Sequence, residues 1–328
     1  MSITDFDMEL LDQMQYDFPL DEQPFESISQ RLGVDGEQLL ERVSGLLGSG
    51  VIRKISYLIN QRSTRYREVA LIGARVPKER ILKATGTINS RKVVTHNYLR
   101  NHERYNVWFT FKAETLNELY EGVEELVTEA EIRDFVVLPS KRVYKISYVK
   151  YDLEKGVLRC PPRIEPMSVP TLEELDVDVS LALDLARGIR PERNPFRPLA
   201  NRQGFGEGEL LDLLHELVEK GVIRDWGAVL DGGRLGFSVD AMVVLRAPAE
   251  RVGDVCLEIV KRFEEISHCV EREVAPNRWE YPAYFVTHAR ERKTIDLFVE
   301  QVRDMLCLEE CLPLYSIANL RRERPIVM

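Results

Sequence analysis

The stretch from Val93 to Phe111 reads VVTHNYLRNHERYNVWFTF, and a weaker echo, ISHCVEREVAPNRWEYPAYFVTHA, runs from Ile266 to Ala289. Each stretch is typical of a β-hairpin rich in His, Arg, Tyr and Trp. The chain has five histidines, and four of them lie in these two stretches: His96, His102, His268 and His288. The two hairpins are therefore the first place to look for a functional site.

The chain is an internal duplication. Gly-Val-Ile-Arg occurs at 50–53 and again at 221–224, a histidine follows Thr at 96 and Ser at 268, and Leu-Pro occurs at 138–139 and 312–313. The three landmarks recur in the same order and with nearly equal spacing, which indicates two homologous halves.

The front part of each half carries three short helical patterns and an alternating strand, which together predict a winged helix-turn-helix. In the first half we expect helices at 6–14, 25–32 and 36–47 and a strand over 50–60. In the second half we expect helices at 179–185, 195–202 and 207–219 and a strand over 221–230.

The back part of each half alternates strand and helix in the order βαββαβ, which predicts a ferredoxin-like sandwich of helices on an antiparallel sheet. The expected elements of the first half are 68–76, 79–88, 92–101, 105–113, 116–128 and 132–138. Those of the second are 239–245, 251–263, 266–273, 281–288, 294–305 and 310–317.

These patterns predict an α+β chain built as a tandem repeat of a winged helix-turn-helix and a ferredoxin-like domain. A stretch with four prolines and no periodicity separates the halves as a linker. The combination resembles the Lrp/AsnC family, in which the sheets of two subunits pack face to face, so we expect one chain to form a pseudo-dimer. The expected domains are 1–61, 62–151, 177–232 and 233–328, with the linker at 152–176.

Composition narrows the class of protein. With 44% hydrophobic and 30% charged residues, the chain is typical of water-soluble globular proteins. It contains no apolar run of about 18 residues that would span a membrane, and its acidic start lacks the features of a signal peptide. Five scattered cysteines without a CxxC pair are typical of free thiols in a reducing compartment and disfavour a zinc site. We therefore expect a cytoplasmic protein that does not contact membranes.

The charge pattern disfavours DNA binding, although a winged helix usually serves that purpose. The net charge is −9, and a nucleic-acid surface has to be basic. The expected recognition helix of the first half, GEQLLERVSGLL, has two acids and one base. Its counterpart in the second half, GEGELLDLLHELVEKG, has five acids and one lysine. We therefore interpret both winged helices as structural and expect no nucleic-acid partner.

The polar residues of the hairpins point to a ligand. His96, Tyr98, Arg100 and His102 alternate along one expected strand and should project from one side of it. A sheet face with these groups in register costs stability if it is only core, because each buried polar group needs a partner. Matching or facing positions carry further candidates: Tyr105, Trp108, His268, Arg272, Tyr281 and Tyr284. Arginine forks bind carboxylates, aromatic rings supply flat surface, and imidazole transfers protons or ligates iron, which together suit a large, planar, polyanionic ligand.

THNYLRNHERYNVWFTF and SHCVERE…WEYPAYFVTH resemble the signatures of the siroheme decarboxylases, an Lrp/AsnC-derived family of paired or fused subunits. The resemblance spans nearly the whole chain. It implies removal of the C12 and C18 acetate carboxyls of siroheme to give 12,18-didecarboxysiroheme, in an alternative route to heme or heme d1. The reaction it implies is non-oxidative and uses no added cofactor, since the iron belongs to the substrate.

The resemblance also implies roles for the candidates. We expect His96 or His102 in one half, and His268 or His288 in the other, to donate protons or to contact the substrate iron axially. The protein alone should hold no metal. Arg100 and Arg272 would anchor carboxylates with the help of Tyr98, and Trp108 and Tyr284 would shape the cavity. The second hairpin has Val270 in place of the tyrosine and four extra residues. Which half is catalytic stays open at this point, as does any assembly of the pseudo-dimer into a larger homo-oligomer.

Two other functions fit the same residues. One is an Lrp/AsnC-like transcriptional regulator that senses a tetrapyrrole or an amino acid, and it predicts sequence-dependent DNA binding. The other is a carrier of heme or siroheme, which predicts binding without turnover.

Overall fold

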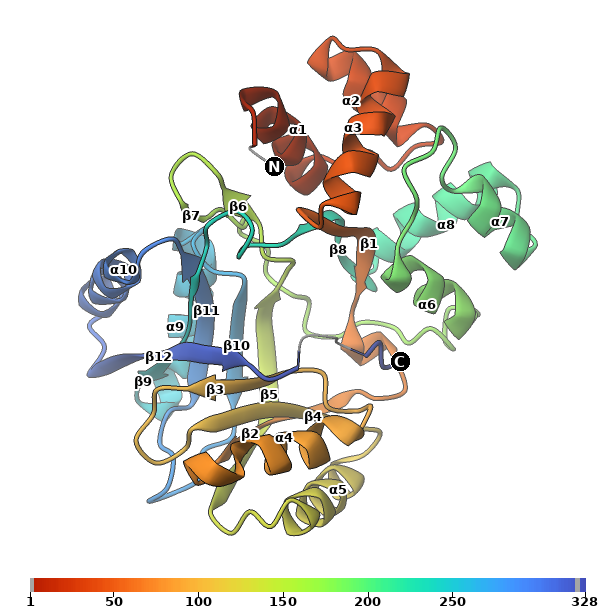
Figure 1. Cartoon of the computed structure of the whole chain (residues 1–328). Helices are drawn as coiled ribbons and strands as arrows, with labels where there is room; N and C mark the ends of the chain where they lie inside the picture. The colour runs from red at the N-terminus through yellow and green to blue at the C-terminus, as the bar shows by residue number, and fades with distance from the viewer. Residues whose placement is uncertain (1–2, 322–324) are drawn as a thin grey trace. The chain divides into compact units, whose positions relative to one another are not determined.

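The computed structural model describes residues 3–321 and 325–328, and the chain divides into two compact units. We call them the helical unit and the sheet unit (Figure 1). The helical unit consists of Met1–Ser63, Ser147–Cys160 and Ser168–Ser238. The sheet unit consists of Thr64–Ile146, Pro161–Met167 and Val239–Met328.

The helical unit contains both predicted helix-turn-helix copies, each with three helices and one strand. The first copy has α1 (Asp5–Tyr16), α2 (Pro24–Leu32), α3 (Gly36–Gly48) and β1 (Ile52–Ile59). The second copy has α6 (Val179–Arg187), α7 (Arg197–Gln203), α8 (Glu207–Glu219) and β8 (Ile223–Leu230). Local chemistry sets the boundaries: Thr4 forms a capping box with Asp7 at the start of α1, and Gly33 ends α2 in the left-handed conformation.

The strands of the two copies pair with each other. β1 and β8 form a two-stranded antiparallel sheet, in which Tyr57 lies opposite Trp226. The unit also holds a short hairpin of β6 (Tyr151–Asp152) and β7 (Val157–Leu158), next to and within the predicted linker. Both helix-turn-helix copies therefore lie in one compact unit, joined by the pairing of β1 with β8.

The sheet unit contains both βαββαβ halves. The first half has β2 (Glu68–Ala74), α4 (Ile81–Ser90), β3 (Asn97–Arg100), β4 (Val107–Ala113), α5 (Leu116–Glu129) and β5 (Phe135–Ile146). The second half has β9 (Val239–Arg246), α9 (Val252–Arg262), β10 (His268–Arg272), β11 (Ala283–Ala289), α10 (Arg292–Met305) and β12 (Glu310–Asn319). The α+β fold class predicted from the sequence is confirmed.

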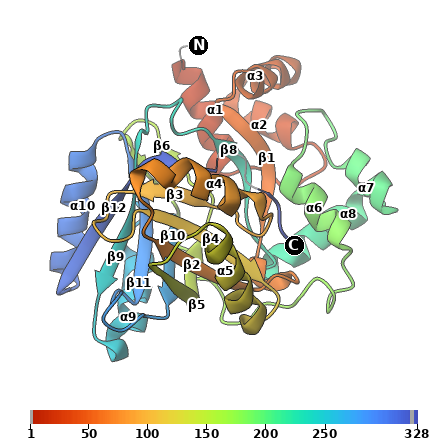
Figure 2. The ribbon, with the colours of Figure 1, turned by 60° about the horizontal axis from the view of Figure 1, so that its bottom comes forward.

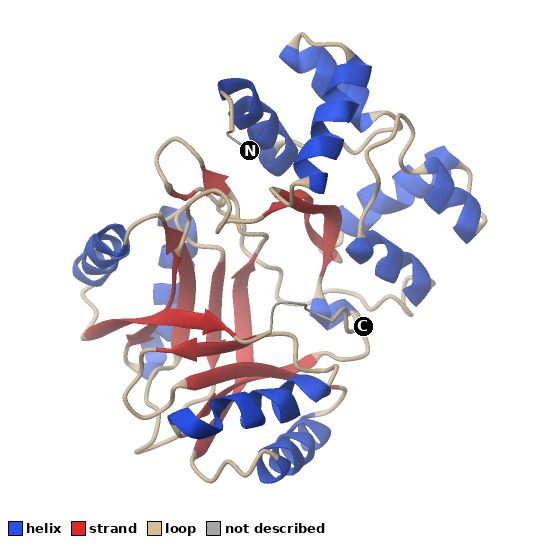
Figure 3. Ribbon diagram, viewed as in Figure 1, coloured by secondary structure: helices blue, strands red, loops and turns tan. Residues whose placement is uncertain are grey.

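The strands of the sheet unit form a closed ring. Their order is β10-β5-β2-β4-β3-β12-β9-β11, and β11 also pairs with β10. Two antiparallel junctions, β3 with β12 and β5 with β10, join the halves. The helices α4 and α5 lie against the strands of the first half, and α9 and α10 lie against those of the second (Figure 2). The ring therefore has an outer face toward the helices and an inner face (Figure 3).

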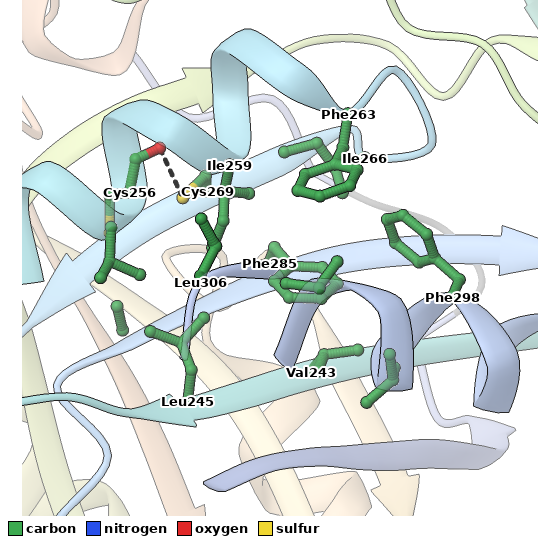
Figure 4. Packing of buried hydrophobic residues seen from close by; sticks show 14 of the residues in the cluster. Val243, Leu245, Cys256, Ile259, Phe263, Ile266, Cys269, Phe285, Phe298 and Leu306 are labelled. Carbon is green, nitrogen blue, oxygen red and sulfur yellow. Dashed lines mark hydrogen bonds between the residues drawn. The ribbon is translucent and has the colours of Figure 1, made fainter. Parts of the chain in front are cut away.

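Apolar side chains fill the space between the outer face and the helices. In the first half Ile72 and Phe109 pack under α4 and α5. In the second half Phe285 packs against Phe298 of α10 with ring centroids 5.9 Å apart (Figure 4). Because side chains alternate along a strand, this packing turns the intervening residues toward the inner face. Among the described residues, no helix is long and apolar enough to cross a membrane.

Gly73 of β2 allows Trp108 of the neighbouring β4 to pack against the backbone. The two residues are paired in register, and a Cβ atom on Gly73 would lie 2.7 Å from Cη2 of Trp108. We expect Gly73→Ala to lower the free energy of unfolding by about 1–3 kcal/mol, because the indole ring has to shift. Equilibrium urea unfolding measures the change.

The matched control is Gly86→Ala in α4, where a Cβ atom meets nothing within 4 Å. Alanine stabilises an exposed helix position relative to glycine by about 0.5–1 kcal/mol. The two variants should therefore move the unfolding midpoint in opposite directions, and a shift in the same direction would contradict the packing described for Gly73.

Candidate functional site

The inner face of the closed ring is buried where Trp108, Met242, Val244 and Leu314 pack together, and it is partly exposed along β11. Along β11 the outward-facing residues Ala283, Phe285, Thr287 and Ala289 are buried, whereas Tyr284, Val286 and His288 between them remain partly exposed. A core strand would bury both sets, so this part of the inner face is accessible. It is the surface on which most of the predicted site residues lie.

Two arginines lie at equivalent positions on this face. Arg100 ends β3 and donates from Nη1 to the carbonyl oxygen of Leu314 on β12, at 2.8 Å. Arg272 ends β10 and donates from Nη1 to the carbonyl oxygen of Leu138 on β5, at 2.9 Å. Each arginine therefore reaches across a junction between the halves. Both are almost fully buried, with 6% and 5% of their surface exposed.

A tyrosine ring accompanies each guanidinium group. The Cζ atom of Arg100 lies 4.9 Å from the ring centre of Tyr98, and that of Arg272 lies 5.2 Å from the ring centre of Tyr284. The Tyr284 hydroxyl also accepts a hydrogen bond from Nη2 of Arg272, at 3.1 Å. These contacts fix the planes of both guanidinium groups.

Two histidines have the same local contact. Nδ1 of His96 lies 3.0 Å from the hydroxyl of Thr95, and Nδ1 of His268 lies 2.8 Å from the hydroxyl of Ser267. A hydroxyl that donates to Nδ1 leaves the proton of a neutral imidazole on Nε2. Both rings are half-buried, and His96 also stacks on Tyr98 with centroids 6.5 Å apart. The duplication has therefore kept two similarly oriented imidazoles.

His102 does not share a strand with His96 and Arg100, contrary to the expectation from its spacing. β3 ends at Arg100, and His102 lies in the connection to β4. Its Nδ1 accepts hydrogen bonds from the backbone N–H groups of Arg104 at 3.2 Å and Tyr105 at 3.0 Å. The two N–H groups hold the ring in the turn, which ends the alternation on which the prediction rested.

His102 belongs instead to an aromatic cluster at one end of the inner face. Its ring lies 5.3 Å from Trp279 and 6.1 Å from Tyr105, and Trp108 and Trp279 approach to 4.7 Å. The indole N–H of Trp108 donates to the carbonyl oxygen of Tyr105, at 2.7 Å. Tyr281 packs on Trp279 at 4.9 Å, and burial, together with Glu310, raises the pKa of Tyr281 to about 12. The aromatic cluster forms an apolar wall, and the Tyr281 hydroxyl in this wall stays protonated near neutral pH.

The structure adds Trp279 and Asp240 to the predicted residues. Trp279 lies on the four-residue extension of the second hairpin, which is closed by paired hydrogen bonds between Ala275 and Trp279. Asp240 of β9 lies 3.6 Å from Nη1 of Arg100 and opposite His288 in the register of β9 and β11. The extra length of the hairpin was the signal for Trp279. Asp240 lies near the start of an apolar strand, and no sequence pattern marked it as a candidate site residue.

Burial of His102 makes stability depend on pH. Burial lowers its pKa, and Glu103 opposes this effect in part. Below the unfolded-state pKa of about 6.5, the unfolded chain takes up a proton that folded His102 resists, so the free energy of unfolding falls as the pH falls. We expect His102→Asn, whose amide oxygen can accept the same backbone hydrogen bonds, to lose part of this dependence. Urea unfolding at about pH 7.5 and about pH 5.5 tests it, and equal slopes for both proteins would contradict it.

Within the residues that the structure describes, no group of three or more His, Cys, Asp or Glu side chains is placed to hold a metal ion. The accessible imidazoles on the inner face can each offer one nitrogen. Such an arrangement suits a single contact to an iron atom that arrives with its own macrocycle, or the transfer of a proton.

Comparison with known proteins gives consistent matches across the chain. A family model of the AsnC-like ligand binding domain matches residues 66–145 and 234–321, and one of the siroheme decarboxylase NirDL-like HTH domain matches residues 7–53. A siroheme decarboxylase of Hydrogenobacter thermophilus is 29% identical over 95% of this chain and 91% of its own length. The siroheme decarboxylase alpha subunit of Desulfovibrio desulfuricans is 35% identical over 43% of this chain and 79% of its own length.

A solved structure matches over nearly the whole chain. It is the siroheme decarboxylase NirDL in co-complex with an iron-uroporphyrin III analogue, and it superposes with a TM-score of 0.65 at 25% sequence identity. The match covers 98% of this chain and 93% of that one. The likeness extends over both halves of the duplication.

Proposed function

As the chain belongs to the siroheme decarboxylase family, we propose that it removes the C12 and C18 acetate carboxyls of siroheme as carbon dioxide. The product is 12,18-didecarboxysiroheme, an intermediate on a route to heme or heme d1. The enzyme is a carboxy-lyase. The observation that carries the proposal is the pair of equivalent His and Arg sets, His96 with Arg100 and His268 with Arg272, on the partly exposed inner face.

The substrate matches these groups chemically. Siroheme is a flat iron macrocycle edged with acetate and propionate groups, so a site for it needs cationic forks and apolar surface. Arg272 supplies a cationic fork and Arg100 lies at the equivalent position, Tyr98 and Tyr284 lie against the two guanidinium groups, and Trp108 belongs to the apolar wall. Tyr105 and Tyr281 complete that wall.

The reaction needs a leaving carboxylate, an electron acceptor and a proton. The bond between the acetate methylene carbon and its carboxyl carbon breaks, carbon dioxide leaves, and the electron pair stays on the methylene carbon, where the conjugated macrocycle delocalises it. A proton then converts the methylene to a methyl group. Carbon dioxide and the proton balance the step, so it is non-oxidative and needs no added cofactor.

His96 and His268 are the proposed proton donors. In both, a hydroxyl lies within hydrogen-bond distance of Nδ1, and when that hydroxyl donates, Nε2 carries the proton of the neutral ring. His288 is also on the accessible face and is the third candidate. The same Nε2 atoms could contact the substrate iron axially, which an absorption spectrum of the bound ligand distinguishes. The two hydrogen bonds that His102 accepts from the backbone favour a positioning role for it.

The surface of the helical unit argues against the alternative of an Lrp/AsnC-like regulator. α8, the second recognition helix, exposes Glu209, Asp212, Glu216 and Glu219. α3 exposes acidic residues as well, and its arginine, Arg42, is paired with Asp7. A helix with this charge is repelled by phosphates. The helices therefore favour a structural role for the helix-turn-helix copies.

The test is anaerobic incubation of the purified chain with siroheme, followed by mass spectrometry of the extracted tetrapyrrole. Loss of two carbon dioxide units is the expected result, and heat-denatured protein is the control. Binding of siroheme without any change in its mass would overturn the proposal in favour of a carrier. Retardation of DNA at physiological salt would support the regulator.

A further inference from the structure

The two arginines differ in the charge around them. Arg100 has a counter-ion inside the protein, because Oδ1 of Asp240 lies 3.6 Å from its Nη1. The Ser316 hydroxyl donates to the same carboxylate at 2.5 Å and holds it in place. The Arg100 charge is therefore largely neutralised before any ligand binds.

Arg272 has only neutral acceptors among the described residues. Nη1 donates to the carbonyl oxygen of Leu138 at 2.9 Å and to the Ser140 hydroxyl at 3.0 Å, with the carbonyl oxygen of Val69 at 3.5 Å. Nη2 donates to the Tyr284 hydroxyl at 3.1 Å. The guanidinium is as buried as that of Arg100, but its charge is not balanced by a carboxylate.

The difference arises from one substitution between the halves. Asp240 lies opposite His288 on β11, and Val69 lies opposite Lys112 at the equivalent place on β4. Val69 is therefore the structural counterpart of Asp240. Asp240 belongs to the second half and approaches Arg100 of the first half. Val69 belongs to the first half and approaches Arg272 of the second half. The duplication has an acid at one of these positions and an apolar residue at the other.

A buried cation without a counter-ion is unfavourable, and an anionic ligand relieves that cost. A carboxylate binds an arginine best through two parallel hydrogen bonds. Along the Nε–Nη2 edge of Arg272, Nε has no partner and Nη2 has only the Tyr284 hydroxyl. Nε of Arg100 is likewise buried without a partner, so the charge around the two arginines, and not the unpaired Nε atom, distinguishes them. At Arg100 the nearby Asp240 would repel an incoming carboxylate.

We propose that Arg272, with Tyr284 and Ser140, binds a peripheral carboxylate of the tetrapyrrole, whereas Asp240 keeps the Arg100 position from doing so. The inference rests on the proposed function and goes further, because it makes the two halves unequal and sets the orientation of the substrate. Arg272 and Tyr284 come from the second half and Ser140 from the first, so both halves contribute to this position.

The test is titration of iron uroporphyrin III, followed by its absorption spectrum, into four single variants. Arg272→Gln is expected to raise the Kd about tenfold or more, and Arg100→Gln by less than about threefold. Val69→Asp adds the missing carboxylate beside Arg272 and should weaken binding about as much as Arg272→Gln. Asp240→Asn is the reciprocal change and should tighten binding. Circular dichroism establishes that each variant is folded, and if Arg272→Gln does not fold, Val69→Asp and Asp240→Asn decide the question.

A parallel titration of iron coproporphyrin III, which has methyl groups in place of the acetates, identifies the carboxylate. Loss of affinity for iron uroporphyrin III alone assigns an acetate to Arg272, and loss for both ligands assigns a propionate. The inference is overturned if Arg100→Gln weakens binding as much as Arg272→Gln, or if Val69→Asp has no effect. If the unaltered protein binds neither ligand, the proposed function itself fails.

Discussion

The double variant His96→Ala/His268→Ala is expected to form 12,18-didecarboxysiroheme from siroheme about 10²–10⁴-fold more slowly than the unaltered protein, because a positioned general acid contributes about this factor to proton transfer. Both imidazoles lie on the accessible inner face, each with a hydroxyl at Nδ1. Binding of iron uroporphyrin III should persist, since the arginines are unchanged. Each single variant keeps one donor, so the tetrapyrrole that has lost one carbon dioxide should accumulate. Mass spectrometry of timed samples measures both losses.

The chain offers a matched control for this experiment in His215→Ala. His215 lies on α8 of the helical unit, where Nε2 is 3.2 Å from the carbonyl oxygen of Leu20. Its replacement should leave turnover within about twofold, the range expected of an exposed side chain that is not part of the proposed site. A double variant that turns over within about tenfold of the unaltered protein would contradict the assignment of both donors. An altered absorption spectrum of the bound ligand in either single variant would instead indicate an axial contact.

The sequence predicted the elements well because their signals are local. Caps, glycines and the alternation of apolar residues lie within a few positions of each boundary, and α8 was predicted at its observed limits. The duplication then placed Arg100 and Arg272 at equivalent positions. Those two residues and His96 and His268 do lie on one face, as expected.

The features that the sequence did not predict depend on contacts between distant segments. The two junctions that close the ring, β3 with β12 and β5 with β10, and the pairing of β1 with β8 join residues that no local pattern relates. Asp240 looks like an ordinary polar residue at a strand end until Arg100 is placed beside it. The predicted position of His102 was wrong for a different reason. The strand ends at Arg100, and two backbone N–H groups hold the His102 ring in the turn, so the alternation of side chains along the strand does not extend to His102.

The neighbouring residues Trp108 and Phe109 of β4 provide a test of which face binds the ligand. Trp108 faces inward and is 1% exposed, and Phe109 faces the helices and is fully buried. Removing either large ring leaves a cavity, so Trp108→Ala and Phe109→Ala should each lower the free energy of unfolding by about 3–5 kcal/mol. Urea unfolding followed by circular dichroism measures both. The two variants should therefore be destabilised equally, but Trp108→Ala alters the inner face and Phe109→Ala alters the outer face.

Only Trp108→Ala is expected to weaken the binding of iron uroporphyrin III, by about tenfold or more, because it removes part of the apolar wall that Trp108 forms with Trp279. Trp108→Phe keeps a flat ring, loses the hydrogen bond to Tyr105 and should have an intermediate effect. Titration is carried out at a temperature where all three variants are folded. Equal loss of affinity in Trp108→Ala and Phe109→Ala would show that binding follows stability alone. It would contradict the prediction that the substrate binds to the inner face.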